Sequence, residues 1–164
     1  MPGDEQRESF VRNFGGIYEH SPWVAERAFP KAAGVNDPER LAQLLAAEVD
    51  RAPEDAKLRL IRAHPDLAGR AAVAGQLGAA STEEQASAGI DQCTPEEFSR
   101  FQTLNRRYKQ KFGFPFVMAV RGSSRQAILA GFEERLENDR ETEFARAIEE
   151  IHKIAKLRLQ VDAL

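Results

Sequence analysis

Cysteine is almost absent from this sequence. Cys93 is the single one among 164 residues, so no disulfide can form within the chain, and no Cys or His cluster has the spacing of zinc ligands. We expect no metal site. The first thirty residues hold no apolar segment typical of a secretory signal, and no run approaches the roughly eighteen apolar residues needed to cross a bilayer. These absences predict a soluble, cytoplasmic protein without a membrane partner.

An excess of positive charge is also missing. The chain has 23 Lys and Arg against 26 Asp and Glu, a net charge of −3. No tail or block of charge could neutralise a phosphate backbone. The densest basic stretch, between Arg106 and Lys111, falls in a helical pattern and is better explained as a solvated helix face. We therefore predict that the protein does not bind nucleic acid.

Helix-start signals are frequent along the chain. A short polar residue precedes proline in Ser21-Pro22, Asp37-Pro38 and Thr94-Pro95, where the side chain can cap free amides and proline fits the first turn. Thr94 is also followed three residues later by Glu97, which is the spacing of a capping box. Each of these sites predicts a helix N-terminus.

The apolar pattern agrees with a helical fold. Leu41, Leu44, Leu45 and Val49 recur at helical spacing, and no sustained alternation with a period of two appears. The one strand-like run, 114–120, is too short and solitary to make a sheet. We predict an all-α protein, residues 1–164 forming a single-domain bundle of about seven to nine helices with no sheet. The expected helices span 5–14, 21–29, 37–50, 53–63, 66–77, 81–90, 94–112, 124–137 and 140–161.

Three histidines, His20, His64 and His152, could transfer protons near neutral pH. His64 differs from the others because it ends an apolar-periodic segment and precedes Pro65. Proline disfavours helical geometry at the residue before it, so the helix is expected to end at His64. Such a break can direct a side chain into a cleft. From spacing alone, a capping or structural role is the simpler interpretation.

A second candidate site is the run from Ser81 to Gln85. Ser81 and Glu84 have the spacing of a capping box at the start of a helix, and capping alone would account for both. Gln85 is not needed for a cap. The free amides of a first helical turn also suit a carboxylate or an imide-like anion. The run is therefore predicted to cap a helix, to bind an anion, or to do both.

The third candidate follows the long predicted helix that ends at residue 112. Three phenylalanines surround Gly113 and Pro115 in this stretch. Gly113 can end the helix in left-handed geometry, and Pro115 favours an extended chain whose backbone groups are open to a ligand. An extended, aromatic-lined backbone would suit a flat heterocycle with alternating donors and acceptors. A loop that only fills the core explains the same residues equally well.

Five short motifs, spread over roughly residues 10–160, stand out when these candidates are read together. In their order and spacing they resemble the 2-oxo-4-hydroxy-4-carboxy-5-ureidoimidazoline (OHCU) decarboxylases, which complete the route from urate to allantoin. The motifs are Phe14–Glu19 with Ser21–Trp23, His64–Leu67, Ser81–Gln85, Asn105–Tyr108 and Phe112–Phe116.

The resemblance implies an all-α fold, usually a homodimer, with no metal or organic cofactor and a small ureide as substrate. It assigns proton transfer to His64 and a catalytic role to Glu84. The remaining residues of the predicted site are expected to contact the substrate: Pro65, Ser81, Thr82, Glu83, Gln85, Phe116, Val117, Met118, Ala119, Val120 and Arg158.

The implied function is cofactor-independent decarboxylation of OHCU to (S)-allantoin in urate catabolism. Such a substrate carries its carboxylate on a ring carbon that also bears a hydroxyl, beside an unsaturated position that can accept electrons. The protein must orient it, stabilise the developing anion and deliver a proton to one face, with His64 as the acid–base group. Two other interpretations stay open: a non-catalytic helical interaction module, and a hydrolase or isomerase of a related ureide.

Overall fold

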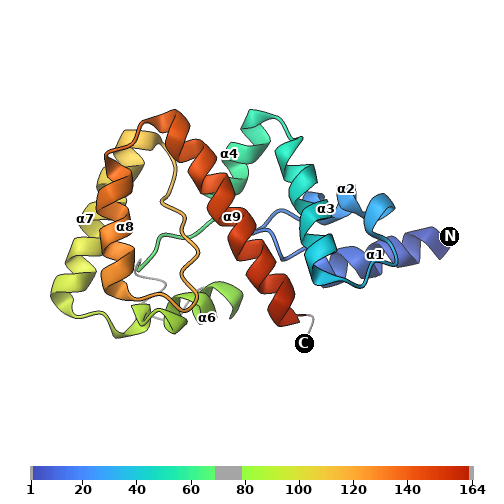
Figure 1. Cartoon of the computed structure of the whole chain (residues 1–164), viewed down its shortest axis with the longest axis horizontal. Helices are drawn as coiled ribbons and strands as arrows, with labels where there is room; N and C mark the ends of the chain where they lie inside the picture. Colours follow the sequence, from blue (N-terminus) through green and yellow to red (C-terminus); the bar gives the residue numbers. More distant parts are fainter. Residues whose placement is uncertain (1, 69–78, 163–164) are drawn as a thin grey trace. The chain divides into compact units, whose positions relative to one another are not determined.

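Helices form all the regular secondary structure in the computed structural model of this chain, which describes residues 2–68 and 79–162 (Figure 1). No strand occurs within these two ranges, so the all-α prediction is confirmed. Contacts group the chain into two compact units, residues 1–63 with 151–164, and residues 64–150. The organisation of the chain as one domain stays a prediction.

The first unit is built from helices that pack in chain order, with α1 against α2 and α2 against α3. Its core is mainly aliphatic, with Leu45, Val49 and Ile61 fully buried. The last part of the long helix α9 also belongs to this unit. Its helices are α1 (Pro2–Phe14), α2 (Trp23–Ala32), α3 (Pro38–Asp50), α4 (Glu54–Arg62) and α9 (Arg140–Asp162).

The second unit has an aromatic core. The rings of Phe116 and Phe132 stack with their centroids 3.8 Å apart, and Tyr108 meets both rings edge-on. Offset and edge-to-face pairs of this kind add to the gain from burying the rings. Besides the first part of α9, the unit contains α6 (Ala79–Ser87), the short 3-10 helix η1 (Ile90–Gln92), α7 (Pro95–Phe112) and α8 (Arg125–Leu136).

Several helix ends follow the predicted signals. The Asp37 side chain accepts a hydrogen bond from the Glu39 N–H at the start of α3, and Thr94 and Glu97 form a complete capping box on α7. Gly113 ends α7 in the left-handed conformation with φ 81°. Ser21 does not cap α2, because its hydroxyl donates to the Glu19 carbonyl and the helix begins at Trp23.

Two other helix predictions need correction. The expected helix 66–77 is wrong at its start, because residues 66–68 lie outside any helix and Leu67 and Ala68 form a turn; residues 69–77 are not among those described. Helix α6 begins at Ala79, so Ser81 and Glu84 both lie inside it. The capping-box interpretation of Ser81 and Glu84 is therefore wrong, and capping no longer explains Glu84.

The chain between α7 and α8 must run back along the helices. Arg125 at the start of α8 bonds to Glu97 at the start of α7, while Lys111 near the end of α7 donates to the Leu136 carbonyl at the end of α8. The two helices are therefore parallel, and the connection returns over the roughly 18 Å length of α8. The connecting segment 114–120 contains no helical turn (Figure 1), as expected for an extended chain.

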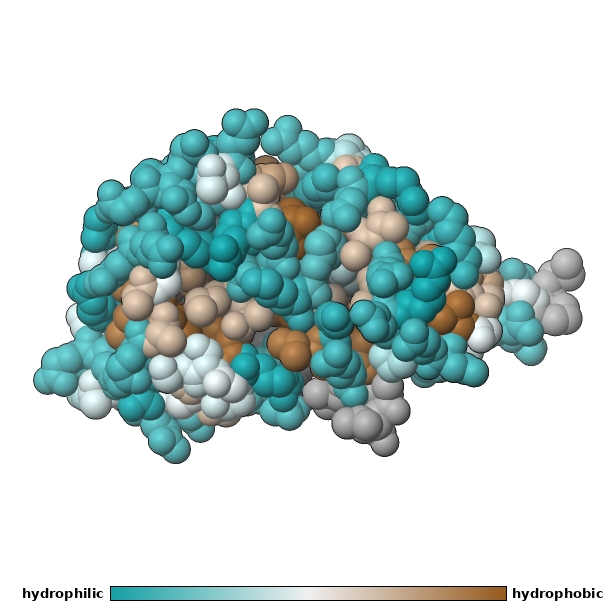
Figure 2. All heavy atoms as spheres, viewed as in Figure 1, coloured by the Kyte–Doolittle hydropathy of each residue, from teal (hydrophilic) through white to brown (hydrophobic). Residues whose placement is uncertain are grey.

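Hydrophilic residues cover most of the face of the molecule drawn in Figure 2, with apolar residues in small groups between them. None of the helices described is long and apolar enough to cross a membrane. Residues 2–68 and 79–162 contain no group of three or more His, Cys, Asp or Glu that could hold a metal ion.

Removal of the α7 cap tests the assignment of its N-terminus. Thr94→Ala deletes the hydroxyl that accepts from the Glu97 N–H at 3.1 Å, so we expect the free energy of unfolding to fall by about 1 kcal/mol. Denaturant titration measures this loss. Thr103→Ala on the same helix is the matched control and should change stability by less than about 0.5 kcal/mol. Equal losses in both variants would contradict the cap.

Candidate functional site

His64 lies just beyond the end of α4, where the sequence predicted a break. The helix ends at Arg62 with Ala63 as its C-cap, and the His64 side chain is buried, with 8% of its surface exposed. Pro65, which follows, is half-buried. The imidazole is therefore placed by a fixed turn in the backbone rather than by a regular helix.

The amide of Gln85 holds the segment that follows His64. Its Oε1 accepts from the Ala68 N–H at 3.0 Å, and its Nε2 donates to the Asp66 carbonyl at 3.5 Å. These bonds bring α6, which also carries Glu84, against the turn that begins at His64. These two bonds use one N–H of the Gln85 amide and one lone pair of its oxygen. The second N–H and the second lone pair can therefore bind a ligand.

Helix α7 holds the same turn from another direction. Asn105 Nδ2 donates to the Leu67 carbonyl at 2.8 Å, Gln102 Nε2 to the Ala68 carbonyl at 2.8 Å, and Lys109 Nζ to the Asp66 carboxylate at 2.7 Å. Sequence reasoning missed these three residues as parts of the site. For Asn105 a signal existed, because it lies at helical spacing among buried Phe101, Leu104 and Tyr108, and a polar residue on an apolar face needs a buried partner.

The turn contains a strained residue. Ala68 has φ 54°, in the left-handed region that costs a residue with a Cβ roughly 1–2 kcal/mol. Both of its backbone groups are bonded, the N–H to Gln85 and the carbonyl to Gln102. Backbone strain held in place by surrounding bonds is a frequent feature of functional sites.

Helix α6 also contacts the end of the extended segment. Glu83 Oε1 accepts from Arg121 Nη1 at 3.3 Å, and Ser87 Oγ accepts from the Gly122 N–H at 3.3 Å. Glu84 lies between these two positions in the sequence and is 8% exposed. Helix α6 is therefore bonded both to the turn after His64 and to the chain just after Val120. The structure describes the backbone of Ser81 and Thr82 within α6 but not their side chains.

The extended segment is fixed at two backbone groups. Val117 C=O accepts from Arg135 Nη1 at 2.6 Å, and Ala119 N–H donates to Glu150 Oε1 at 3.0 Å. In an extended chain the groups of alternate residues point to the same side, so those of Met118 point away from α8 and α9. No described residue bonds to the N–H or C=O of Met118, which is half-buried. Phe116 and Val120 are buried on either side of this open peptide edge.

Arg158 lies in the other compact unit. Its Nη1 donates to the Ile17 carbonyl at 3.2 Å and its Nη2 to Glu19 Oε2 at 2.8 Å, with 6% of the residue exposed. Nearby in this unit, Tyr18 Oη bonds to His152 Nδ1 at 2.7 Å, and burial raises the pKa of this tyrosine. The structure thus shows Arg158 in a partly buried ion pair with Glu19, and its role as a substrate-binding residue stays a prediction.

The second unit contains three of the predicted elements, and α6 is bonded both to the turn after His64 and to the chain just after Val120. The imidazole of His64, at a rigid break in the backbone, can move a proton. The buried carboxylate of Glu84 on α6 can act on a developing charge. The open, half-buried peptide edge at Met118 can bind a group with adjacent donors and acceptors.

Comparison with known proteins gives one consistent family. The sequence profile of the family described as OHCU decarboxylase matches residues 4–160. The chain is 44% identical to the OHCU decarboxylase of Haloferax volcanii, over 93% of this chain and 88% of the relative. It is 37% identical to the OHCU decarboxylase of Mus musculus, over 92% and 84%.

A solved structure agrees with the sequence comparisons. The crystal structure of an (S)-allantoin synthase superposes with a TM-score of 0.75 at 34% identity, covering 95% of this chain and 50% of that chain. The match extends over both compact units, because it takes in nearly the whole sequence. By its sequence and its fold, this chain belongs to the OHCU decarboxylase family.

Proposed function

We propose that this protein decarboxylates OHCU to (S)-allantoin without a cofactor, with His64 as the acid–base group. The observation that carries the proposal is the fixed turn after His64, which Gln85 bonds at both Asp66 and Ala68. This turn brings a buried imidazole and the helix that carries Glu84 into one neighbourhood. The family relationship and the relatives named for this activity support the same reaction.

The reaction breaks one carbon–carbon bond and takes up one proton overall. The bond between the ring carbon and the carboxylate breaks, carbon dioxide leaves, and its electron pair forms a ring double bond while the neighbouring C=N bond passes its pair to nitrogen, which is protonated. The resulting enol then loses its hydroxyl proton to become a carbonyl, and the ring carbon that carries the ureido group gains a proton. His64 takes up the hydroxyl proton or polarises the hydroxyl, and supplies a proton to one face of the ring.

Glu84 and the peptide edge complete the proposed site. Glu84 orients His64 or the ureido N–H groups, or destabilises the departing carboxylate by its own charge. The N–H and C=O of Met118 form an adjacent donor and acceptor that match a ureido group, in the way that one strand adds to another. The remaining capacity of the Gln85 amide serves the ring amides. Orientation by several such contacts contributes to the rate by holding a reactive geometry.

We also propose that the protein works as a homodimer in the cytoplasm. A single cysteine suits a reducing compartment, and the resemblance of the motifs to this family implies a homodimer. Light scattering coupled to size-exclusion chromatography measures the mass directly. A mass of about twice the 18.3 kDa of the chain supports the dimer, whereas the mass of one chain at all concentrations would exclude it.

Replacement of His64 tests the acid–base role. His64→Gln keeps a polar side chain of similar length but cannot exchange protons near neutral pH, so we expect kcat to fall by about 10²–10⁴-fold. Circular dichroism at an allantoin band, with OHCU made fresh from urate, follows formation of one enantiomer. His20→Asn is the control, since the His20 side chain is 80% exposed and asparagine tolerates its φ of 47°. Near-normal turnover in folded His64→Gln would remove His64 from the mechanism.

Replacement of Glu84 tests chemistry against structure. Glu84→Gln preserves size and hydrogen bonding but removes the negative charge, so we expect kcat/KM to fall by about tenfold or more while the unfolding midpoint stays close to that of the wild type. Glu96→Gln, at an exposed position in the first turn of α7, is the control for loss of one carboxylate. Wild-type kinetics in Glu84→Gln would show that the charge of Glu84 takes no part.

A further inference from the structure

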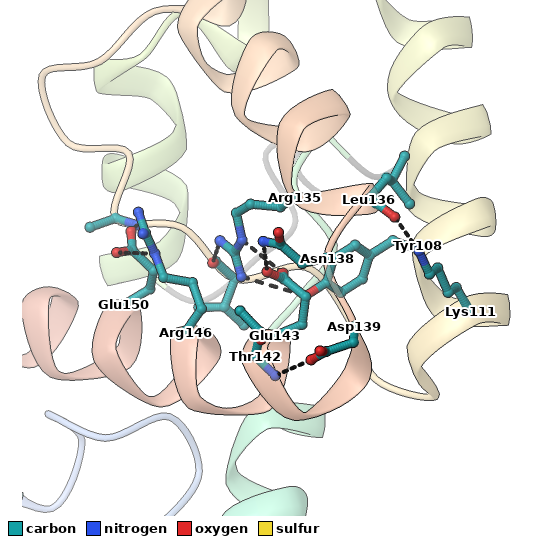
Figure 3. Close-up of polar contacts among 12 residues, drawn as sticks. Tyr108, Lys111, Arg135, Leu136, Asn138, Asp139, Thr142, Glu143, Arg146 and Glu150 are labelled. Atoms are coloured by element: carbon teal, nitrogen blue, oxygen red, sulfur yellow. Dashed lines mark hydrogen bonds and ion pairs between the residues drawn. The ribbon is translucent and has the colours of Figure 1, made fainter.

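A buried ion pair lies behind the extended segment. Arg135 of α8 is 6% exposed and Glu143 of α9 is fully buried, and Arg135 Nε donates to Glu143 Oε1 at 2.8 Å (Figure 3). Tyr108 Oη and Asn138 Nδ2 donate to the same carboxylate at 2.5 and 2.9 Å. Burial and the bond to Glu143 raise the pKa of Tyr108, so its hydroxyl stays protonated and remains a donor. Together, the hydrogen bonds from Arg135, Tyr108 and Asn138 fix the Glu143 carboxylate in one orientation.

Stability alone is a weak reason for such a pair. Desolvating two charges offsets much of their attraction, and well-packed apolar residues of similar volume are often as stable. Unlike an apolar side chain, a planar guanidinium can bond two partners at fixed angles. The role of Arg135 therefore depends on what it bonds besides Glu143.

That second partner is the substrate-facing segment. Arg135 Nη1 donates to the Val117 carbonyl at 2.6 Å, and the guanidinium lies 4.4 Å from the centre of the Phe116 ring. Phe116 in turn stacks on Phe132, which lies one turn before Arg135 on α8. Helix α8 thus holds two consecutive residues of the segment, one by its carbonyl and one by its ring.

Helix α9 fixes the segment at a second point. Glu150 Oε1 accepts from the Ala119 N–H at 3.0 Å, and Arg146 Nε lies 3.3 Å from Glu150 Oε2 (Figure 3). Glu143 and Glu150 are seven residues apart, so they share one face of α9. One of these carboxylates bonds the segment directly, and the other acts through Arg135. The two fixed groups, Val117 C=O and Ala119 N–H, flank Met118.

We propose that Arg135, oriented by Glu143, is a positioning residue for the open peptide edge of Met118 and determines how that edge meets the ureido group of the substrate. The inference rests on the proposed decarboxylase function. Arg135 touches the segment only from behind, so it sets the angle and depth of the Met118 groups without reaching the substrate. Displacement of a binding group by about 1 Å is enough to lower catalysis by about 100-fold.

A matched pair of variants tests this role. Arg135→Lys keeps the charge but replaces the planar fork by a single ammonium nitrogen, so it cannot hold Glu143 and Val117 at the fixed angles of the guanidinium. Arg125→Lys is the control, since Arg125 likewise bonds a carboxylate, Glu97, and a backbone carbonyl, Gly89, at 3.1 and 2.7 Å. We expect kcat/KM to fall by about 100-fold in Arg135→Lys, mainly through KM, and to stay near wild type in Arg125→Lys.

The split between KM and kcat separates positioning from loss of folded protein. A smaller folded fraction lowers kcat and leaves KM unchanged, so that result in Arg135→Lys, or equal kinetics in the two variants, would overturn the proposal. If Arg135→Lys does not fold, the pair Arg135→Met with Glu143→Gln takes its place. This double variant removes both charges, and the amide oxygen of the new glutamine still accepts the hydrogen bond from Tyr108. We expect the same rise in KM.

Amide hydrogen exchange keeps this inference separate from the proposed function. We expect faster exchange at the Ala119 N–H, which donates to Glu150, in Arg135→Lys than in Arg125→Lys, because the segment loses one of its two fixed points. If the wild-type protein fails to convert OHCU, the proposed function falls and the exchange rates alone decide whether Arg135 holds the segment. Equal exchange in both variants would refute the positioning role.

Discussion

The hydrogen bonds of Gln85 to the Ala68 amide and the Asp66 carbonyl are the interaction on which the candidate site depends. They join α6 to the turn after His64 across 17 and 19 residues of sequence. Loss of the first bond would leave the buried N–H of Ala68 unsatisfied in a residue that already carries positive φ. The site is thus held by side-chain to backbone bonds, which keep an irregular stretch of chain rigid without a regular helix or strand.

The extended segment 114–120 is also held by bonds from side chains to its backbone. Among residues 2–68 and 79–162 its backbone has no neighbouring strand, and charged side chains from α8 and α9 supply the bonding partners that a sheet would otherwise give. Arg135 and Glu150 meet Val117 and Ala119 from one side, and the alternation of an extended chain leaves the Met118 groups on the other. A sheet would use both edges of such a segment. An isolated one can offer its second edge to a ligand.

Local signals in the sequence predicted the parts of this arrangement that depend on local chemistry. Asp37, Thr94 and Gly113 mark helix ends because a cap or a left-handed residue acts within four positions of the end it satisfies. The break at His64-Pro65 belongs to the same class. The prediction of a capping box at Ser81 and Glu84 was wrong because the same spacing also occurs inside helices. Helix α6 begins two residues before Ser81.

What the sequence could not predict depends on side chains that meet from distant segments. Asn105 reaches Leu67 across 38 residues, and Arg135 reaches back 18 residues to Val117. Periodicity marks such positions only as polar residues on an apolar helix face, because it carries no information on which backbone group will lie opposite. Buried polar residues at core spacing are therefore useful indicators of where an irregular backbone must be held. In this protein they identify the two non-helical stretches that carry His64 and Met118, and the proposed reaction depends on the geometry of these stretches.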